Sequence, residues 1–109
     1  MNKNELQGFD LLEVTDDGKV KNRKTGYIYR DYSAGKGKKR KGYRKIKVYN
    51  NNGKRVIFYA HRFAYLMRLG EIPKGFVVDH INHIRNDNRI DNLRILPVAI
   101  NRKLKRKKD

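Results

Sequence analysis

An adjacent carboxylate and imidazole, Asp79 and His80, open a polar loop that lies between two short apolar segments. A carboxylate can hold a hard cation and an imidazole can activate a water, and metal-assisted phosphodiester cleavage needs both. Two amides follow, Asn92 where the loop ends and Asn101 one short segment later. These residue types therefore point to hydrolysis of a phosphodiester.

The charge of the chain indicates which phosphodiester that is. Its 109 residues carry 28 Lys and Arg against 11 Asp and Glu, a formal net charge of +17. A compact domain with this charge repels itself unless a polyanion is nearby. Nucleic acid is the leading partner, whereas the absence of a long apolar run or a basic amphipathic helix disfavours a membrane.

Cysteine is absent, which excludes a disulfide framework and any thiolate zinc site. The polar N-terminus, residues 1–5, has no apolar signal core. We expect a cytoplasmic protein, in a bacterial host if the chain is phage-encoded.

The elements that must position these residues are a hairpin and a helix. Residues 76–78 read as a strand, residues 89–95 as its return, and Pro97 fits the first turn of a helix that carries Asn101 in its second turn. Neighbouring strand residues point to opposite faces. One face could therefore offer Asp79 and Asn101 oxygens to a cation, while His80 approaches the phosphate from another side.

The preceding part of the chain predicts a small antiparallel sheet. Alternating or β-prone segments separated by turns occur at residues 11–14, 20, 27–29, 43–49 and 55–59. Helical spacing over residues 61–69 predicts a helix packed on this sheet. The expected fold is α+β, with a basic β-rich part at residues 1–59 and the hairpin–helix core with its basic tail at residues 60–109, together forming one compact unit.

The second half of the chain resembles the ββα-metal core of the HNH endonucleases, in particular the branch found in phage homing endonucleases. The resemblance covers roughly residues 56–103. It is carried by Asp79-His80, by the string Asn88-Arg89-Ile90-Asp91-Asn92-Leu93, by Asn101, and by the upstream Ala60-His61-Arg62-Phe63-Ala64.

The resemblance implies a role for each motif residue. His80 is the general base, and Asn92 ties the loop to the hairpin and holds that base in place. Asn101 stands where other branches have a final His, and it would bind the metal with Asp79. Two oxygen donors with one negative charge suit Mg²⁺ or Mn²⁺ better than Zn²⁺.

Segment 33–42 is a glycine-rich basic loop that gains most from a polyanion. The residues assigned to phosphate contacts are Lys38, Lys39, Arg40, Lys41, Arg44 and, in the expected helix, Arg62. Arg89 and Arg94 are taken as surface charges, and His83 as a loop residue. His61 either packs at the helix start or contacts phosphate. The N-terminal sheet is the expected source of sequence preference.

We therefore expect a metal-dependent endonuclease that nicks or cuts double-stranded DNA. One centre per chain cuts one strand, so a double-strand break needs a homodimer or two events. The alternative is a non-catalytic nucleic-acid-binding protein on a degenerate HNH scaffold, or a ribosome-associated protein. Salt-sensitive binding without metal-dependent cleavage would favour that alternative.

Overall fold

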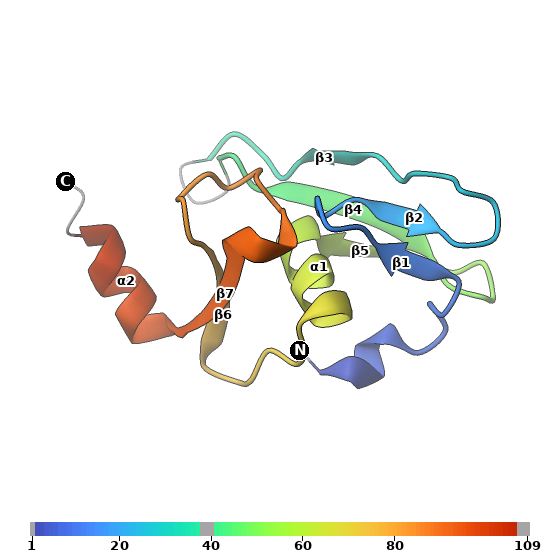
Figure 1. The fold of residues 1–109 in the computed structure, drawn as a ribbon. Helices are drawn as coiled ribbons and strands as arrows, with labels where there is room; N and C mark the ends of the chain where they lie inside the picture. The colour runs from blue at the N-terminus through green and yellow to red at the C-terminus, as the bar shows by residue number, and fades with distance from the viewer. Residues whose placement is uncertain (1, 38–40, 107–109) are drawn as a thin grey trace.

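The computed structural model describes residues 2–37 and 41–106. Three antiparallel sheets, ordered β1-β2, β3-β4-β5 and β6-β7, surround a helix (Figure 1). This mixture of helices and small antiparallel sheets confirms the predicted α+β class. The elements in chain order are η1 (Lys3–Leu6), β1 (Leu12–Val14), β2 (Val20–Asn22), β3 (Asp31–Ser33), β4 (Arg44–Tyr49), β5 (Arg55–Tyr59), α1 (Ala60–Arg68), β6 (Phe76–His80), η2 (Ile90–Asn92), β7 (Leu93–Pro97) and α2 (Val98–Arg106).

The β4–β5 hairpin follows from strict alternation in the sequence. Ile46 and Val48 are buried on one face of β4, whereas Lys47 and Tyr49 are exposed on the other. In a β-strand alternate side chains point to the same face, so β4 has one apolar face and one polar face. The strand is therefore stable only when it is paired with β5 and its apolar face is covered by an apolar layer. Both strands lie where the sequence predicts them.

Helix α1 supplies the centre of the core. Phe63, Ala64 and Leu66 have 0% exposure, and their spacing gives the helix one apolar side. The helix contacts β1, β4 and β5 as well as β6 and β7, and Figure 1 shows it lying between the β6–β7 hairpin and the three-stranded sheet. Among the described residues no helix is long and apolar enough to span a bilayer.

One hydrophobic cluster joins the two halves of the chain. Phe9, Leu12 and Val48 from the first half belong to the same buried cluster as Val78 and Leu93 from the β6–β7 hairpin. The hairpin therefore does not stand apart from the N-terminal sheets. Its position relative to them is set by close packing, which tolerates little displacement.

Three predicted elements differ from the structure. The return strand expected at residues 89–95 is shorter and later, because residues 90–92 form η2 and β7 begins at Leu93. Residues 27–29 do not form a strand: Ile28 makes an isolated bridge to Lys21, and Tyr27 and Ile28 remain 58% and 45% exposed. The strand comes slightly later, at β3. Pro97 does not begin the last helix but ends β7, where it pairs with Phe76, and α2 begins at Val98.

Candidate active site

The β6–β7 hairpin and α2 bring the predicted cation ligands together. Strand β6 continues through His80, and its register sets Asp79 opposite Arg94. Helix α2 follows β7 directly, so Asn101 lies one turn into the helix, beside β6. The Asn101 Nδ2 donates to Asp79 Oδ1 over 3.0 Å, and the Arg94 Nε donates to Asp79 Oδ2 over 3.0 Å. The Asp79 carboxylate is buried, and each of its oxygens has a hydrogen-bond partner.

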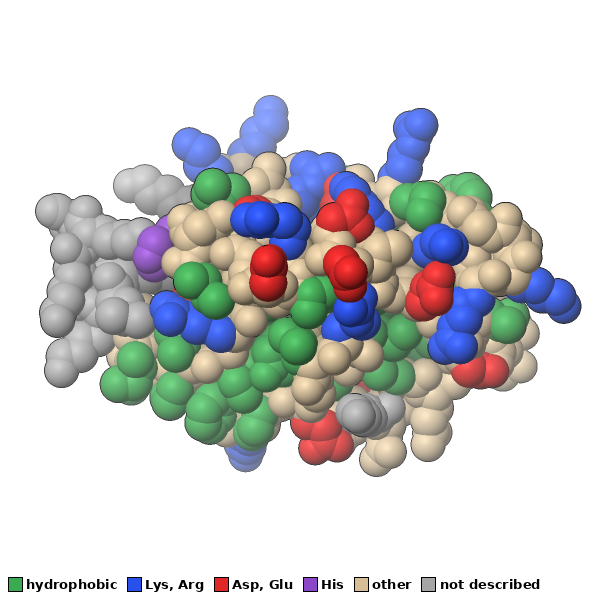
Figure 2. All heavy atoms as spheres, in the orientation of Figure 1, with side chains coloured by type: hydrophobic (Ala, Val, Ile, Leu, Met, Phe, Trp, Pro, Cys, Tyr) green, Lys and Arg blue, Asp and Glu red, His purple; other side chains and the backbone are tan. Residues whose placement is uncertain are grey.

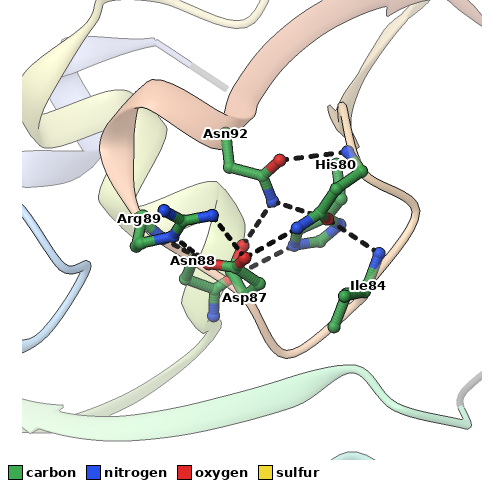
Figure 3. Close-up of polar contacts among 7 residues, drawn as sticks. His80, Ile84, Asp87, Asn88, Arg89 and Asn92 are labelled. Carbon is green, nitrogen blue, oxygen red and sulfur yellow. Dashed lines mark hydrogen bonds and ion pairs between the residues drawn. The ribbon is translucent and has the colours of Figure 1, made fainter.

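The imidazole of His80 lies in a different environment from that carboxylate. It is 3% exposed, and its Nε2 lies 2.8 Å from Oδ1 of Asn88 (Figure 3). An amide oxygen can only accept, so in the neutral ring Nε2 carries the proton and Nδ1 carries the lone pair. Burial lowers the pKa of His80 below its usual 6.5, against the opposing effects of the Asn88 hydrogen bond and of the Asp79 and Asp87 carboxylates. The ring is therefore mainly a neutral base at pH 7.

Asn92 closes the loop between the two strands. Its Oδ1 accepts from the backbone N–H of Asn82 over 3.0 Å, and its Nδ2 donates to Asn82 Oδ1 and to the Asp87 carbonyl over 2.9 and 2.8 Å. The Asp87 carboxylate in turn accepts from the Arg89 guanidinium, the main cause of its lowered pKa. The loop that carries Asn88 is thus held on both sides (Figure 3).

Aromatic rings from outside the hairpin enclose His80. The His61 ring, from the first turn of α1, lies 5.1 Å from the His80 ring, and the Tyr43 ring stacks on His61 at 5.0 Å. The Arg85 guanidinium lies 4.5 Å from the Tyr43 ring centre, at cation–π distance. His61 is buried, so packing describes its position better than a phosphate contact does.

A cleft of about 240 Å³ adjoins Asn101. Arg62 is exposed at this cleft, with its guanidinium 5.0 Å from the Tyr59 ring centre. The cleft therefore combines a cation with the edge of the Asp79–Asn101 pair. Its walls are Tyr43, Tyr59, His61, Arg62, Val77, Val78 and Asn101.

Comparison with known proteins identifies this arrangement. Residues 58–103 match the family model described as HNH endonuclease. This segment is therefore similar to an HNH endonuclease core. The solved structure of the HNH homing endonuclease I-HmuI, reported for its DNA binding and cleavage, is similar over 89% of this chain, with 26% identity and a TM-score of 0.72. The match covers 52% of that protein, so the chain spans about half its length. No curated protein matches the chain.

The residues of the matched segment can be tested for fit to a metal ion. In the described part of the chain, no group of three or more His, Cys, Asp and Glu side chains could hold one. Asp79 and Asn101 supply one carboxylate and one amide, 3.0 Å apart. Turning the amide about its last bond would bring its oxygen toward the carboxylate in place of its nitrogen. This donor set fits a hard cation that keeps several waters, such as Mg²⁺ or Mn²⁺.

The predicted phosphate contacts fall into three groups. Lys38, Lys39 and Arg40 lie outside the described residues. Lys41 and Arg62 are exposed. Arg44 is partly buried, and its Nε donates to Asp31 Oδ1 over 3.0 Å, so this guanidinium already has a carboxylate partner.

Two site residues were missed by reasoning from the sequence. Asn88 was seen only as part of the motif string, although it is the residue that bonds His80. Arg94 was taken as a surface charge, although it pairs with Asp79. The signal for Arg94 was available: extending the first strand through His80 sets the two residues opposite each other. Nothing in the sequence singles out Asn88 from the other loop asparagines.

Proposed function

We propose that this protein is a metal-dependent endonuclease that hydrolyses phosphodiester bonds of double-stranded DNA. The observation that carries the proposal is the state of His80. A buried, mainly neutral imidazole has its Nε2 proton engaged by Asn88, which leaves the Nδ1 lone pair to accept a proton. The likeness to a homing endonuclease reported for DNA cleavage supports the same reaction.

In the proposed reaction, a water oxygen attacks phosphorus while Nδ1 of His80 takes its proton. The bond from phosphorus to the 3′ oxygen breaks, and that oxygen then takes a proton from solvent. A divalent cation held by Asp79 and Asn101 would stabilise the charge that develops on the phosphate and the leaving oxygen. Asn88 keeps His80 in the tautomer that has its lone pair on Nδ1, and Asn92 keeps the loop closed around it.

The DNA would be held mainly through its phosphates. The formal charge of +17 gives a long-range attraction for a polyanion. On the face shown in Figure 2, Lys and Arg side chains project from the upper edge, and acidic side chains lie beside basic ones across the middle. Basic side chains thus gather at the upper edge of this face. We assign the contact nearest the reaction to Arg62, which lines the cleft beside Asn101.

Cleavage of a supercoiled plasmid with Mg²⁺ or Mn²⁺ tests the proposal. His80→Ala should lower the cleavage rate by about 10²- to 10⁴-fold, the usual contribution of a positioned general base. His83→Ala is the matched control, because this imidazole of the same loop is exposed, and it should cut within about threefold of wild type. Equal cutting by the His80→Ala protein would overturn the assignment.

A second candidate function is DNA or RNA binding without cleavage. The observation that favours it is the ion pair between Arg94 and the buried Asp79, which occupies one oxygen of the proposed cation ligand. This candidate predicts salt-sensitive binding, with log affinity falling by about 0.9 per phosphate neutralised for each unit of log salt. It also predicts intact plasmid at every Mg²⁺ or Mn²⁺ concentration.

A further inference from the structure

The turn between β1 and β2 touches the active-site loop although about 70 residues separate them in the sequence. Gly18 packs directly on the backbone of Asn88: a Cβ added at Gly18 would overlap the Asn88 carbonyl oxygen and lie 2.6 Å from its carbon. Two residues further along the loop, the Ile90 N–H donates to the Asp16 carbonyl over 2.9 Å. The turn therefore holds the loop at two points, on either side of Arg89.

The turn is itself firmly anchored. Arg68, at the end of α1, donates to the Val14 carbonyl over 2.7 Å and pairs with Asp16 at 2.6 Å. The strands that flank the turn place Val14 and Val20 in the hydrophobic core, at 5% and 1% exposure. A support tied to the core and to α1 can fix the position of whatever rests on it.

What rests on the turn is the partner of His80. The Asn88 side chain bonds Nε2 of His80, so the Asn88 backbone position determines whether that 2.8 Å contact can form. We propose that the turn at residues 16–18 is a positioning element of the active site, acting on His80 through Asn88. This inference rests on the proposed nuclease function for its kinetic consequence, but not for its structural one.

Two separate features of the structure favour glycine at position 18. Its φ of +82° is one that side chains rarely adopt. The absence of a Cβ also lets the turn approach Asn88. Gly26 separates the two reasons, because its φ of +76° is nearly the same and a Cβ there would meet nothing within 4 Å. Gly18→Ala and Gly26→Ala therefore share the backbone strain, and only the first displaces Asn88.

The experiment compares these two variants by plasmid cleavage, DNA affinity and ¹⁵N NMR of the histidine rings, with thermal unfolding to establish that both are folded. We expect Gly18→Ala to lower kcat by about 10- to 100-fold with DNA affinity changed less than about threefold, because misplacing a catalytic group mainly affects the chemical step. The His80 nitrogen shifts should move toward a mixture of tautomers. Gly26→Ala should leave kcat within about threefold of wild type, and its His80 nitrogen shifts should equal those of wild type within error.

A second variant guards against failure of Gly18→Ala to fold. Arg68→Met removes both contacts of Arg68 with the turn without adding bulk near Asn88, and it should shift the His80 resonances in the same direction with a smaller loss of kcat. In an Asn88→Ala background, Gly18→Ala should cost no more than about a further threefold, since residues that act through one another are not additive. Unchanged His80 resonances in folded Gly18→Ala or Arg68→Met would overturn the inference. Wild-type protein that cuts no DNA would instead overturn the proposed function, and the NMR comparison would still decide the role of the turn.

Discussion

Replacing Asn88 by Ala removes the acceptor for a buried donor. The His80 ring is 3% exposed and its Nε2 has Asn88 Oδ1 at 2.8 Å. A buried donor left without a partner costs about 1–3 kcal/mol. In a domain of this size, each kcal/mol of lost stability lowers the melting temperature by about 4–8 °C. The matched control is Asn86→Ala, because this asparagine of the same loop is exposed, and such changes stay within about 0.5 kcal/mol.

The same substitution should also slow cleavage. Without Asn88 the ring can adopt either tautomer and can tilt, but its contacts with the Tyr43 and His61 rings remain. We therefore expect kcat to fall by about 10- to 100-fold, which is less than the 10²- to 10⁴-fold that a general base can contribute. Urea unfolding and plasmid cleavage measure the two effects. If Asn88→Ala matches Asn86→Ala in both, the hydrogen bond to His80 does not have the role given to it here.

Three further predictions address pH, metal and DNA. Burial holds the pKa of His80 below 6.5 in the folded state, so the unfolded chain binds more protons and wild type should lose stability as pH falls from 6.5 toward the folded pKa. In urea unfolding at several pH values, the His80→Gln protein should lack this part of the pH dependence. Identical pH profiles for the two proteins would refute the prediction. Arg94→Met removes the cation that occupies Asp79, so half-maximal cleavage should need less Mg²⁺, and an unchanged or increased requirement would show that Arg94 does not compete with the metal. Arg62→Ala should weaken DNA binding and reduce the slope of log affinity against log salt by about 1, whereas an unchanged slope would remove Arg62 from the phosphate contacts.

The elements that the sequence predicted well are those with strong periodicity. Ile46 and Val48 alternate with polar residues in β4, and Phe63 and Leu66 share one side of α1. Both patterns reflect the burial of a whole face, which is the dominant favourable term in folding. The prediction of a strand at residues 27–29 was wrong because the β-propensity of Tyr and Ile depends on the surface available for packing, and Tyr27 is left 58% exposed.

The geometry of the candidate site was predictable where it follows local structure. Asp79 and Asn101 meet because a hairpin leads directly into a helix, and that order is visible in the sequence. The partner of His80 was not predictable in this way. Several asparagines lie in the loop, and the one that reaches the ring is selected by contacts with Gly18 and Asp16, from the opposite end of the chain. Such long-range contacts leave no periodic signature.

The hydrophobic cluster shared by the two halves has a consequence for protein engineering. The stretch recognisable as an HNH core begins at residue 58, but Val78 and Leu93 belong to one buried cluster with Phe9, Leu12 and Val48, which lie before that residue. A fragment cut at that boundary would lose the cluster members contributed by the first half of the chain and would expose part of this apolar surface. Chimeras that exchange target preference between relatives will therefore need junctions chosen within the packing, not at the end of the recognisable motif.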